Sequence, residues 1–361
     1  MVFLLVLPTD RLGGAERVAM NLIRFLAKNN ENFIYIHFLS LDKSLSWDEF
    51  NHFSNVNITY SYSSSVKLGL LSFLNVVRKI DSNIDYIYST HAHVNSLLCT
   101  LRRIKALNCS NLILRESSIL STRFSGFKRK LIDVVYLPYG NQDLLICQTS
   151  LMQDKLLEHR GSRVSRNSYV IPNPLDIDLI EKKSKPSFFS DEYKNFKIVM
   201  VGRLIEIKNH RLVIESLSKL DLDYNLFIVG DGPLKENLQS LCDSLNLKDK
   251  VTFVGNVTNP YKYMKDADLG VISSFSEGFP NVLIEMMAAG TKDIIITPCT
   301  GDLEKIPNIT ITKDFSVEEM TSSILRKMKQ PLDNTKAYYE YSYSRDVDSY
   351  WNKIEELLKV K

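Results

Sequence analysis

Long apolar runs are missing from this chain, because none approaches the roughly 18 residues that a membrane-spanning helix needs. The apolar segment Val2–Leu7 is too short for the apolar region of a secretory signal, follows no basic residue and runs directly into Pro8. We therefore expect this segment to be the first strand of a folded core. A cytoplasmic location is the corresponding expectation.

Cysteine is also scarce, with five residues in a chain of 361. The five are odd in number, widely spaced and form no Cys-x-x-Cys pair, which argues against a disulfide framework and a structural zinc site. No cluster of histidine and cysteine has the spacing of metal ligands either. We expect neither a metal nor another cofactor, and a core-packing role for each cysteine.

The chain lacks the basic and aromatic array of a nucleic-acid-binding module, so no nucleic acid partner is expected. The net charge of +3 hides an asymmetry, since residues 1–170 carry 20 Lys and Arg against 13 Asp and Glu. The excess gathers in Arg102–Lys105, Arg123, Lys128–Lys130 and Lys155–Arg166, beside the apolar residues Ile119, Leu120, Phe124 and Phe127. Such clusters are either solvated helix faces or a means of peripheral attachment to an anionic membrane surface.

What the chain does contain is a regular alternation of apolar runs of strand length with amphipathic segments of helix length. At 361 residues, 44% hydrophobic and 24% charged, it is long enough for two domains of ordinary size. The alternation predicts an α/β fold with two doubly wound, Rossmann-like parallel sheets, and the paired prolines of Ile171–Asp176 mark the boundary between them. The expected strands are Phe3–Leu7, Phe33–Leu39, Tyr86–Ser89, Leu112–Arg115, Leu144–Cys147, Tyr169–Ile171, Lys197–Gly202, Leu226–Val229, Val251–Phe253, Leu269–Ser273 and Ile294–Thr297.

Two carboxylates, Glu277 and Glu285, stand eight positions apart after the apolar run Asp268–Ser273. Pro280 and Asn281 are typical of a helix start, so Glu277 lies in a loop and Glu285 about one helical turn in. Both can then reach one polar ligand whose anionic part rests on the helix N-terminus. A nucleotide sugar fits this arrangement, although an isolated pair at this spacing is more often a helix cap and a solvated residue.

This segment resembles the donor-binding signature of the retaining glycosyltransferases of family 4, the group 1 enzymes of bacterial glycan assembly. Further motifs follow in the order of that family and cover most of the chain. The resemblance implies the GT-B fold, in which two Rossmann-like domains face each other across a cleft. Residues 1–171 would form the acceptor-side domain and 172–344 the nucleotide-sugar-binding domain, with a C-terminal helix at about 345–361 packing back on the first. By the same resemblance Glu285 would hold the ribose, and Glu277 with the backbone of Gly278, Phe279, Pro280 and Asn281 would hold the transferred sugar.

Two cations, Arg203 and Lys208, follow the first expected strand of the second domain. Ligands of open α/β sheets bind at the carboxyl ends of strands, so these cations are placed to clamp a diphosphate. A surface ion pair is the alternative from the sequence alone, and the resemblance assigns them the clamp. It also gives Val254 a backbone contact with the nucleotide base, which leaves the identity of the base open.

Paired glycines, Gly13 and Gly14, follow the first strand and precede a helix. Side chains at these positions would block the approach of a ligand to the backbone, and the helix N-terminus supplies donors. The pair resembles the first glycine loop of the family, which lies near the donor diphosphate and the acceptor. Glu16 and Arg17 also fit the family pattern, with a helix-surface role as the alternative.

Two histidines, His91 and His93, follow the expected strand Tyr86–Ser89. A histidine at the carboxyl end of a strand can hydrogen-bond a sugar hydroxyl, whereas a lone histidine is more often structural. The resemblance implies one histidine here that contacts the ring hydroxyls of the donor sugar. Counting from the strand favours His91 and counting back from Asn95 favours His93, so the register stays open.

Two segments depart from the pattern of the family. Thr291–Ile294 stands where relatives usually have a proline, and Gly301–Glu304 where many have Gly-Pro followed by Glu. Arg115 and Glu116 close another strand and either line the acceptor side or form an ion pair between neighbouring loops.

The resemblance implies a metal-independent, retaining hexosyltransferase. It would move a sugar from a nucleotide diphosphate donor, UDP being the first expectation, to a hydroxyl of a growing, lipid-linked cell-surface glycan. The nucleotide base, the sugar and the acceptor stay open. The alternatives are a GT-B sugar-nucleotide 2-epimerase, which needs no acceptor, and a non-catalytic scaffold subunit. The presence of Arg203, Lys208, Glu277 and Glu285 together favours the transferase.

Overall fold

The computed structural model describes residues 1–41, 43–44, 46–66, 69–80, 83–118, 134–164, 167–189 and 193–360. The chain forms two compact units. Unit 1 comprises Met1–Pro174 and Val347–Lys361, and unit 2 comprises Leu175–Asp346. The sequence placed the division slightly earlier, after Ile171, whereas the units divide after the second of the paired prolines.

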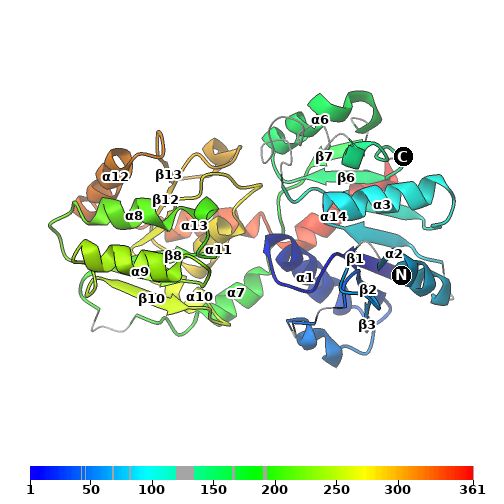
Figure 1. Cartoon of the computed structure of the whole chain (residues 1–361), viewed down its shortest axis with the longest axis horizontal. Helices are drawn as coiled ribbons and strands as arrows, with labels where there is room; N and C mark the ends of the chain where they lie inside the picture. The colour runs from blue at the N-terminus through cyan, green and yellow to red at the C-terminus, as the bar shows by residue number, and fades with distance from the viewer. Residues whose placement is uncertain are drawn as a thin grey trace. The chain divides into compact units, whose positions relative to one another are not determined.

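Unit 1 is built on a parallel sheet with the strand order β3-β2-β1-β4-β5-β6-β7 (Figure 1). Its strands are β1 (Val2–Leu7), β2 (Phe33–Phe38), β3 (Val56–Tyr60), β4 (Tyr86–Ser89), β5 (Asn111–Arg115), β6 (Leu144–Cys147) and β7 (Ser168–Val170). Its helices are α1 (Gly14–Ala27), η1 (Asp48–His52), α2 (Gly69–Lys79), α3 (Ala92–Arg103), α6 (Ser150–Val164) and α14 (Val347–Lys359).

Two apolar clusters cover the two faces of this sheet. In β1 the residues alternating from Val2 pack with α2, α3 and α6, and those alternating from Phe3 pack with α1 and α14, because side chains alternate along a strand. The hydroxyls of Tyr350 on α14 and Tyr88 on β4 are hydrogen-bonded at 2.9 Å. The last helix of the chain is therefore part of the core of unit 1.

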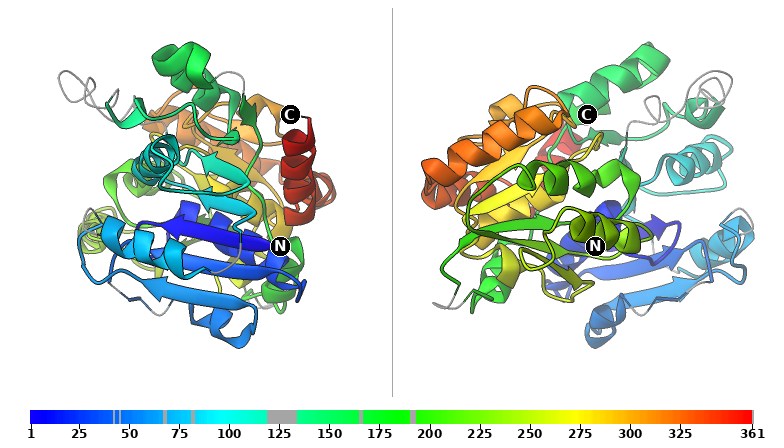
Figure 2. Two further views of the ribbon diagram at one scale, coloured as in Figure 1. Left: turned by 90° about the vertical axis from the view of Figure 1, so that its right-hand side faces the viewer. Right: turned by 60° about the vertical axis from the view of Figure 1, so that its left-hand side comes forward.

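Unit 2 is built on a second parallel sheet with the order β10-β9-β8-β11-β12-β13. Its strands are β8 (Phe196–Val201), β9 (Tyr224–Val229), β10 (Val251–Gly255), β11 (Leu269–Ile272), β12 (Ile294–Ile296) and β13 (Thr310–Ile311). Its helices are α7 (Ile177–Ser184), η3 (Glu206–Lys208), α8 (His210–Leu217), α9 (Lys235–Ser244), α10 (Tyr261–Met264), α11 (Asn281–Ala289), η4 (Leu303–Lys305), α12 (Val317–Lys329) and α13 (Thr335–Tyr343). Helices α8, α9 and α12 share one face of the sheet (Figure 2), and α7, α10, α11 and α13 share the other.

All the strands expected from the sequence are present, with small shifts at their ends. Two more strands, β3 and β13, are not identified by the sequence, and both lie at the edge of a sheet. No residue of β3 is fully buried, and β13 has only two residues. An edge strand buries less side-chain surface than a central one, so its apolar pattern is weak. Two doubly wound parallel sheets nevertheless confirm the expected fold class.

Each sheet reverses its direction of winding at its first strand, because β1 lies between β2 and β4, and β8 lies between β9 and β11. Open α/β sheets bind ligands outside the carboxyl ends of the strands at such a reversal. In unit 1 the relevant loops follow β1 and β4, and in unit 2 they follow β8 and β11. The paired glycines, the two histidines, Arg203, Lys208 and Glu277 lie in these loops or at the helix starts that follow them, whereas Val254 lies in β10.

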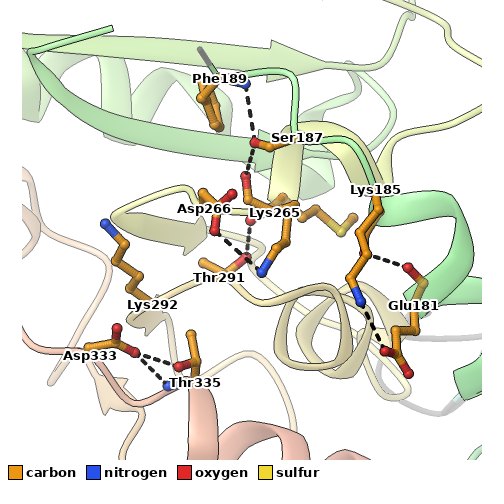
Figure 3. Close-up of polar contacts among 12 residues, drawn as sticks. Glu181, Lys185, Ser187, Phe189, Lys265, Asp266, Thr291, Lys292, Asp333 and Thr335 are labelled. Atoms are coloured by element: carbon orange, nitrogen blue, oxygen red, sulfur yellow. Dashed lines mark hydrogen bonds and ion pairs between the residues drawn. The ribbon is translucent and has the colours of Figure 1, made fainter. Parts of the chain in front are cut away.

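Polar contacts at the opposite, amino edge of the unit 2 sheet join the segments before β11 and β12 (Figure 3). Thr291 donates its hydroxyl to the carbonyl of Met264 at 2.9 Å, and Lys292 pairs with Asp268 at 2.7 Å. These two residues belong to the first departure from the family pattern. Thr291 and Lys292 therefore make these contacts at the amino edge of the sheet, away from the loops at its carboxyl edge.

Candidate active site

An ion pair joins the loops that follow β8 and β11 in unit 2. The ammonium of Lys208 lies 2.5 Å from Oε1 of Glu277, and the hydroxyl of Ser274 donates to the same oxygen at 2.8 Å. The Lys208 and Glu277 side chains are 25% and 17% exposed, so solvent reaches both. Two residues that the sequence assigned to different parts of the donor are thus in direct contact.

Backbone hydrogen bonds fix the position of this ion pair. The N–H of Phe275 donates to the carbonyl of Ile207 at 2.8 Å, which joins the two loops. The N–H of Glu277 donates to the carbonyl of Cys299 at 2.8 Å, in the loop that follows β12. Three neighbouring strand ends therefore position the Glu277 carboxylate.

Arg203 lies in the same loop as Lys208, and its side chain is exposed. Its guanidinium makes no hydrogen bond or ion pair with the residues that the structure describes. We call Arg203, Lys208, Ser274 and Glu277 the clamp cluster. It offers one exposed cation and one cation whose carboxylate partner can be exchanged, and both can hydrogen-bond phosphate oxygens.

Helix α11 begins where the sequence predicts, with Pro280 as its N-cap and Asn281 as its first residue. Glu285 lies one turn further along and is only 5% exposed. This burial rules out the alternative that Glu285 is a solvated surface residue, because an acidic side chain is rarely buried without a specific partner.

The two loop residues before Pro280 differ in what they can offer a ligand. Phe279 packs its ring into the core of unit 2, where the Arg345 guanidinium lies 5.4 Å from the ring centroid. Gly278 is half-buried, and its carbonyl accepts a hydrogen bond from the Thr300 hydroxyl at 2.8 Å. With the Phe279 side chain in the core, this stretch can contact a ligand mainly through its backbone.

Val254 lies near the carboxyl end of β10, the edge strand of the unit 2 sheet. Phe253 is in register with Ile228 and Gly255 with Val229, so Val254 is the extra residue of a β-bulge. A bulge leaves its extra residue outside the hydrogen-bonded ladder. The register shift therefore falls at Val254, the residue to which the resemblance gives a backbone contact with the nucleotide base.

In unit 1 the glycine loop is joined to the loop that follows β4 through Glu16. Gly13 is the N-cap of α1, Gly14 is its first residue, and the N–H of Gly13 donates to Oε2 of Glu16 at 3.1 Å. A side chain at Gly13 would place its Cβ 2.8 Å from that oxygen, so the Glu16 carboxylate would have to shift to make room for it. The other Glu16 oxygen, Oε1, lies 3.2 Å from Nε2 of His91.

Both ring nitrogens of His91 are engaged within unit 1. Nδ1 lies 2.9 Å from the Thr90 hydroxyl, and Nε2 faces Glu16. Burial, with smaller contributions from His93 and Arg115, lowers the pKa of His91 to about 3, so the imidazole is neutral at neutral pH. With Glu16 ionised, the ring proton sits on Nε2 and Thr90 donates to Nδ1. We call Gly13, Glu16, Thr90 and His91 the glycine-loop cluster.

His93 lies on the first turn of α3 and is exposed. Its ring centroid is 5.9 Å from that of His91, and its nitrogens make no hydrogen bond with the described part of the chain. The two histidines are therefore neighbours with different states, one engaged on both nitrogens and one with both nitrogens available.

Arg115 and Glu116 are buried, at 1% and 2% exposure, and form no ion pair with each other. Glu116 accepts hydrogen bonds from Asn95, Tyr136 and Tyr139. Burial raises the pKa of the Glu116 carboxyl, and these hydrogen bonds oppose that shift. Neither alternative from the sequence holds for Glu116, because its carboxylate belongs to an internal network of unit 1.

Metal ligation finds no support in the residues with described positions, among which no group of three or more His, Cys, Asp and Glu could hold an ion. The chain does contain Asp-x-Asp triplets, a pattern that can bind metals, at 176–178, 221–223, 266–268 and 346–348. In the triplet before β11, Asp268 pairs with Lys197 at 3.0 Å and with Lys292 at 2.7 Å. This carboxylate therefore serves the fold at the amino edge of the sheet.

The sequence missed the pairings within both clusters. Thr90 contacts the next residue, His91, and Ser274 contacts Glu277 three positions further on, whereas Thr300 reaches Gly278 from 22 positions away. The family pattern at Glu16 was the one available signal, and it did not indicate His91 as the partner.

Two units, each built on a parallel sheet with helices on both faces, are the fold of the GT-B glycosyltransferases. The solved structure of Anabaena HepE in complex with UDP-glucose has the same fold, with a TM-score of 0.81, 18% identity and 100% coverage of both chains. Residues 181–344 match the family model of the glycosyl transferases group 1. No described helix is long and apolar enough to cross a membrane.

Curated relatives of this chain are named as sugar transferases. An uncharacterized glycosyltransferase of Methanocaldococcus jannaschii is 30% identical over 254 residues, which cover 66% of this chain and 62% of that protein. The Campylobacter jejuni N-acetylgalactosamine-N,N'-diacetylbacillosaminyl-diphospho-undecaprenol 4-alpha-N-acetylgalactosaminyltransferase is 27% identical over 289 residues, 76% of this chain and 75% of that one. Residues 181–344 therefore match the group 1 glycosyltransferases, and the enzyme class expected from the sequence, a hexosyltransferase, is confirmed.

Proposed function

We propose that the protein is a retaining, metal-independent transferase of family 4 that moves a hexose or N-acetylhexosamine from a UDP-sugar to a hydroxyl of a lipid-linked glycan. The clamp cluster carries this proposal, since it places two cations and a carboxylate at the sheet reversal of the group 1 domain. Complexes of HepE with UDP and with UDP-glucose support the choice of nucleotide.

The donor is divided among the residues of unit 2 as follows. Arg203 and Lys208 bind the diphosphate, and the N-terminus of α11 at Asn281 adds backbone donors for the same charge. Glu285 holds the ribose and Val254 the base. When the diphosphate binds, Lys208 leaves Glu277 and pairs with the phosphate oxygens. Glu277, with the backbone from Gly278 to Pro280, then holds the transferred sugar.

Unit 1 supplies the groups for sugar and acceptor hydroxyls. His91 is oriented by Glu16 and Thr90, and His93 has both nitrogens available to a hydroxyl. Gly13 and Gly14 keep the start of α1 open to the ligand. A neutral imidazole suits this task, because it can donate to or accept from an uncharged hydroxyl.

The transfer step needs no protein nucleophile in this proposal. The acceptor oxygen forms the new bond to the anomeric carbon on the face from which the bond to the phosphate oxygen breaks. The hydroxyl proton passes to the departing phosphate oxygen, so atoms and charge balance. The clamp stabilises the negative charge that develops on the diphosphate.

A lipid-linked acceptor is supported by the diphospho-undecaprenol in the name of the Campylobacter relative. Peripheral binding to an anionic membrane remains part of the proposal, on the basic excess of residues 1–170. The segment Ile119–Lys130, with Leu120, Arg123, Phe124, Phe127 and Lys128 to Lys130, lies outside the described residues. Flotation with anionic liposomes at low and high salt tests this part, because salt screens such attraction.

A thermal-shift panel of nucleotide sugars, followed by product analysis with lipid-linked acceptors, tests the function. We expect a UDP-sugar to stabilise the protein and its sugar to appear on the acceptor with the anomeric configuration unchanged. Epimerised donor without acceptor would indicate the 2-epimerase, and donor binding without any turnover would indicate the scaffold subunit. An inverted linkage would contradict the retaining mechanism.

A further inference from the structure

A pocket with a volume of about 570 Å³ lies in unit 1, apart from the glycine-loop cluster and the clamp cluster. One wall is the edge strand β3 and the residues that follow it, Asn57–Tyr62, and the opposite wall is α2. Tyr35 of β2 and the chain after β2, at Leu41 and Lys43, complete the lining. Its volume lies within the range of small-ligand sites, roughly 300–1,000 Å³.

The sequence builds this pocket through two local features. Gly69 starts α2 so close to the chain after β2 that a Cβ there would lie 2.2 Å from the carbonyl oxygen of Leu39. Glycine is thus required for the contact that sets one end of the pocket. Along β3, polar Asn57 and Thr59 alternate with Ile58 and Tyr60, so the face that shares the side of Tyr35 is polar.

The lining combines aromatic rings with hydrogen-bonding groups that have no described partner. Tyr35 and Tyr62 supply the rings, and Tyr62 is 77% exposed. The ring of Tyr60 stacks on Phe38 on the opposite face of the sheet. Asn57 and Asn75 supply amides that make no hydrogen bond with the described residues. Flat aromatic faces beside amide donors and acceptors suit a ligand with apolar C–H faces and many hydroxyls, which is the chemistry of a sugar ring.

The charged residues of the lining are all basic. Lys43 and Lys79 line the pocket, and no carboxylate is among its described lining residues. The Lys43 ammonium lies 4.9 Å from the centroid of the Tyr60 ring, a cation–π contact that orients it. Because two ammonium groups have no described counter-ion, the pocket favours a sugar that carries a negative charge.

The pocket shares a support with the glycine-loop cluster. The Tyr60 hydroxyl lies 3.3 Å from Oδ2 of Asp10, and the N–H of Ser44, beside Lys43, donates to the same oxygen at 2.7 Å. Asp10 is fully buried and lies in the loop that leads from β1 to Gly13. One buried carboxylate therefore fixes a wall of the pocket and the entry to the glycine loop.

We propose that this pocket binds an acidic sugar unit of the acceptor glycan, remote from the hydroxyl that receives the new sugar. That the bound glycan is the acceptor rests on the proposed function. The binding of an acidic oligosaccharide rests on the pocket alone. The carboxylate of the sugar pairs with Lys79 and Lys43, and Tyr62 covers its ring. An acceptor with such a unit then has a lower KM than one without it.

Calorimetry with trigalacturonic acid as probe, and with maltotriose and inorganic phosphate as comparisons, tests the binding. We expect the acidic trisaccharide to bind the wild-type protein more tightly than either comparison. Lys79→Gln is expected to weaken this binding by about tenfold, as for one charge-assisted hydrogen bond, and Tyr62→Ala to weaken it as well. Lys28→Gln, at an exposed lysine elsewhere in unit 1, is the matched control and should change nothing.

Three results would overturn the proposal: no binding of the acidic trisaccharide, equal binding of maltotriose or phosphate, or equal loss in Lys79→Gln and Lys28→Gln. The assay is independent of turnover, so the two proposals fail separately. Lys208→Ala should retain trigalacturonate binding. If the wild-type protein binds trigalacturonate but transfers no sugar to any acceptor tested, the result counts against the proposed function; if it transfers sugar but does not bind trigalacturonate, the result counts against the pocket.

Discussion

The glycine-loop cluster and the clamp cluster occupy equivalent places in the two units, yet they differ in charge and burial. Each lies at the reversal of a parallel sheet. In unit 1 the central pair is Glu16 and a neutral His91, with Glu16 8% exposed. In unit 2 it is Lys208 and Glu277, partly exposed and beside the exposed Arg203.

The difference shows how one architecture provides for two kinds of ligand group. Burial removes the charge of an imidazole and raises the pKa of Glu16, which suits uncharged hydroxyls. In unit 2 the contact with solvent allows Arg203 and Lys208 to stay charged, so an anionic ligand can bind to them.

Removal of either clamp cation should have the largest effect. Lys208→Ala and Arg203→Ala are each expected to lower kcat/KM by about 10²–10³, because a charged contact to the leaving diphosphate is lost. Steady-state kinetics measure this, with circular dichroism as the check on folding. The control is Lys219→Ala, which removes an exposed ion pair of unit 2 with Glu318. Near-wild-type turnover in both clamp variants would remove the clamp from the mechanism.

Acid should destabilise the folded protein through its buried histidines. Burial lowers the pKa of His37 and of His210 from 6.5 to about 4, so the unfolded chain takes up protons that the folded chain resists. Stability is then fully present above pH 6.5 and falls as the pH drops towards 4, by about 2 kcal/mol per histidine at pH 5. Urea denaturation at pH 7.5 and at pH 5 measures the loss of unfolding free energy between the two. This loss should be smaller in His210→Asn than in the wild-type protein, by about the contribution of one histidine. His52→Asn, at an exposed site, is the control. An equal loss in His210→Asn and in His52→Asn would contradict a contribution of the buried His210.

Loss of the Glu16 charge should affect unit 1 without unfolding it. Glu16→Gln is expected to lower kcat by about tenfold, since a charge-assisted hydrogen bond to His91 becomes a neutral one. The KM for the donor should change little if Glu16 acts by positioning His91. Glu31→Gln, at an exposed site of the same unit, is the control. An unchanged kcat would mean that the pair only stabilises the fold.

The two glutamates of unit 2 should have opposite effects on UDP binding. Glu277→Gln frees Lys208 from its partner and should tighten UDP by about two- to fivefold, the range of a partly exposed ion pair. Glu285→Gln should weaken UDP by a similar factor, because the ribose contact is lost. Calorimetry with UDP alone measures both. A change of the same sign in both variants would contradict the division of the donor between them.

Metal removal should have the smallest effect. Transfer is expected to persist in excess EDTA, since Arg203 and Lys208 supply the positive charge that a metal would otherwise bring. Complete loss of activity in the chelator, restored by Mg²⁺ or Mn²⁺, would show that the two cations are insufficient.

Local patterns in the sequence by itself determined the central strands, the start of one helix and the loops that carry the candidate residues. Apolar runs identified the central strands, and Pro280 with Asn281 identified the start of α11, because burial and helix capping depend on neighbouring residues. The same patterns placed Arg203, Lys208, Glu277 and His91 in loops at strand ends.

The tertiary structure alone decided which of these side chains meet. Lys208 and Glu277 are 69 positions apart in the chain and are brought together because β8 and β11 are neighbours in the sheet. Glu16 and His91 meet because β1 pairs with β4. The same strand order places β3 at the edge of the sheet, where it forms a wall of the pocket in unit 1. Pairing between distant strands is set by the packing of the whole sheet, so no local pattern in the sequence encodes it.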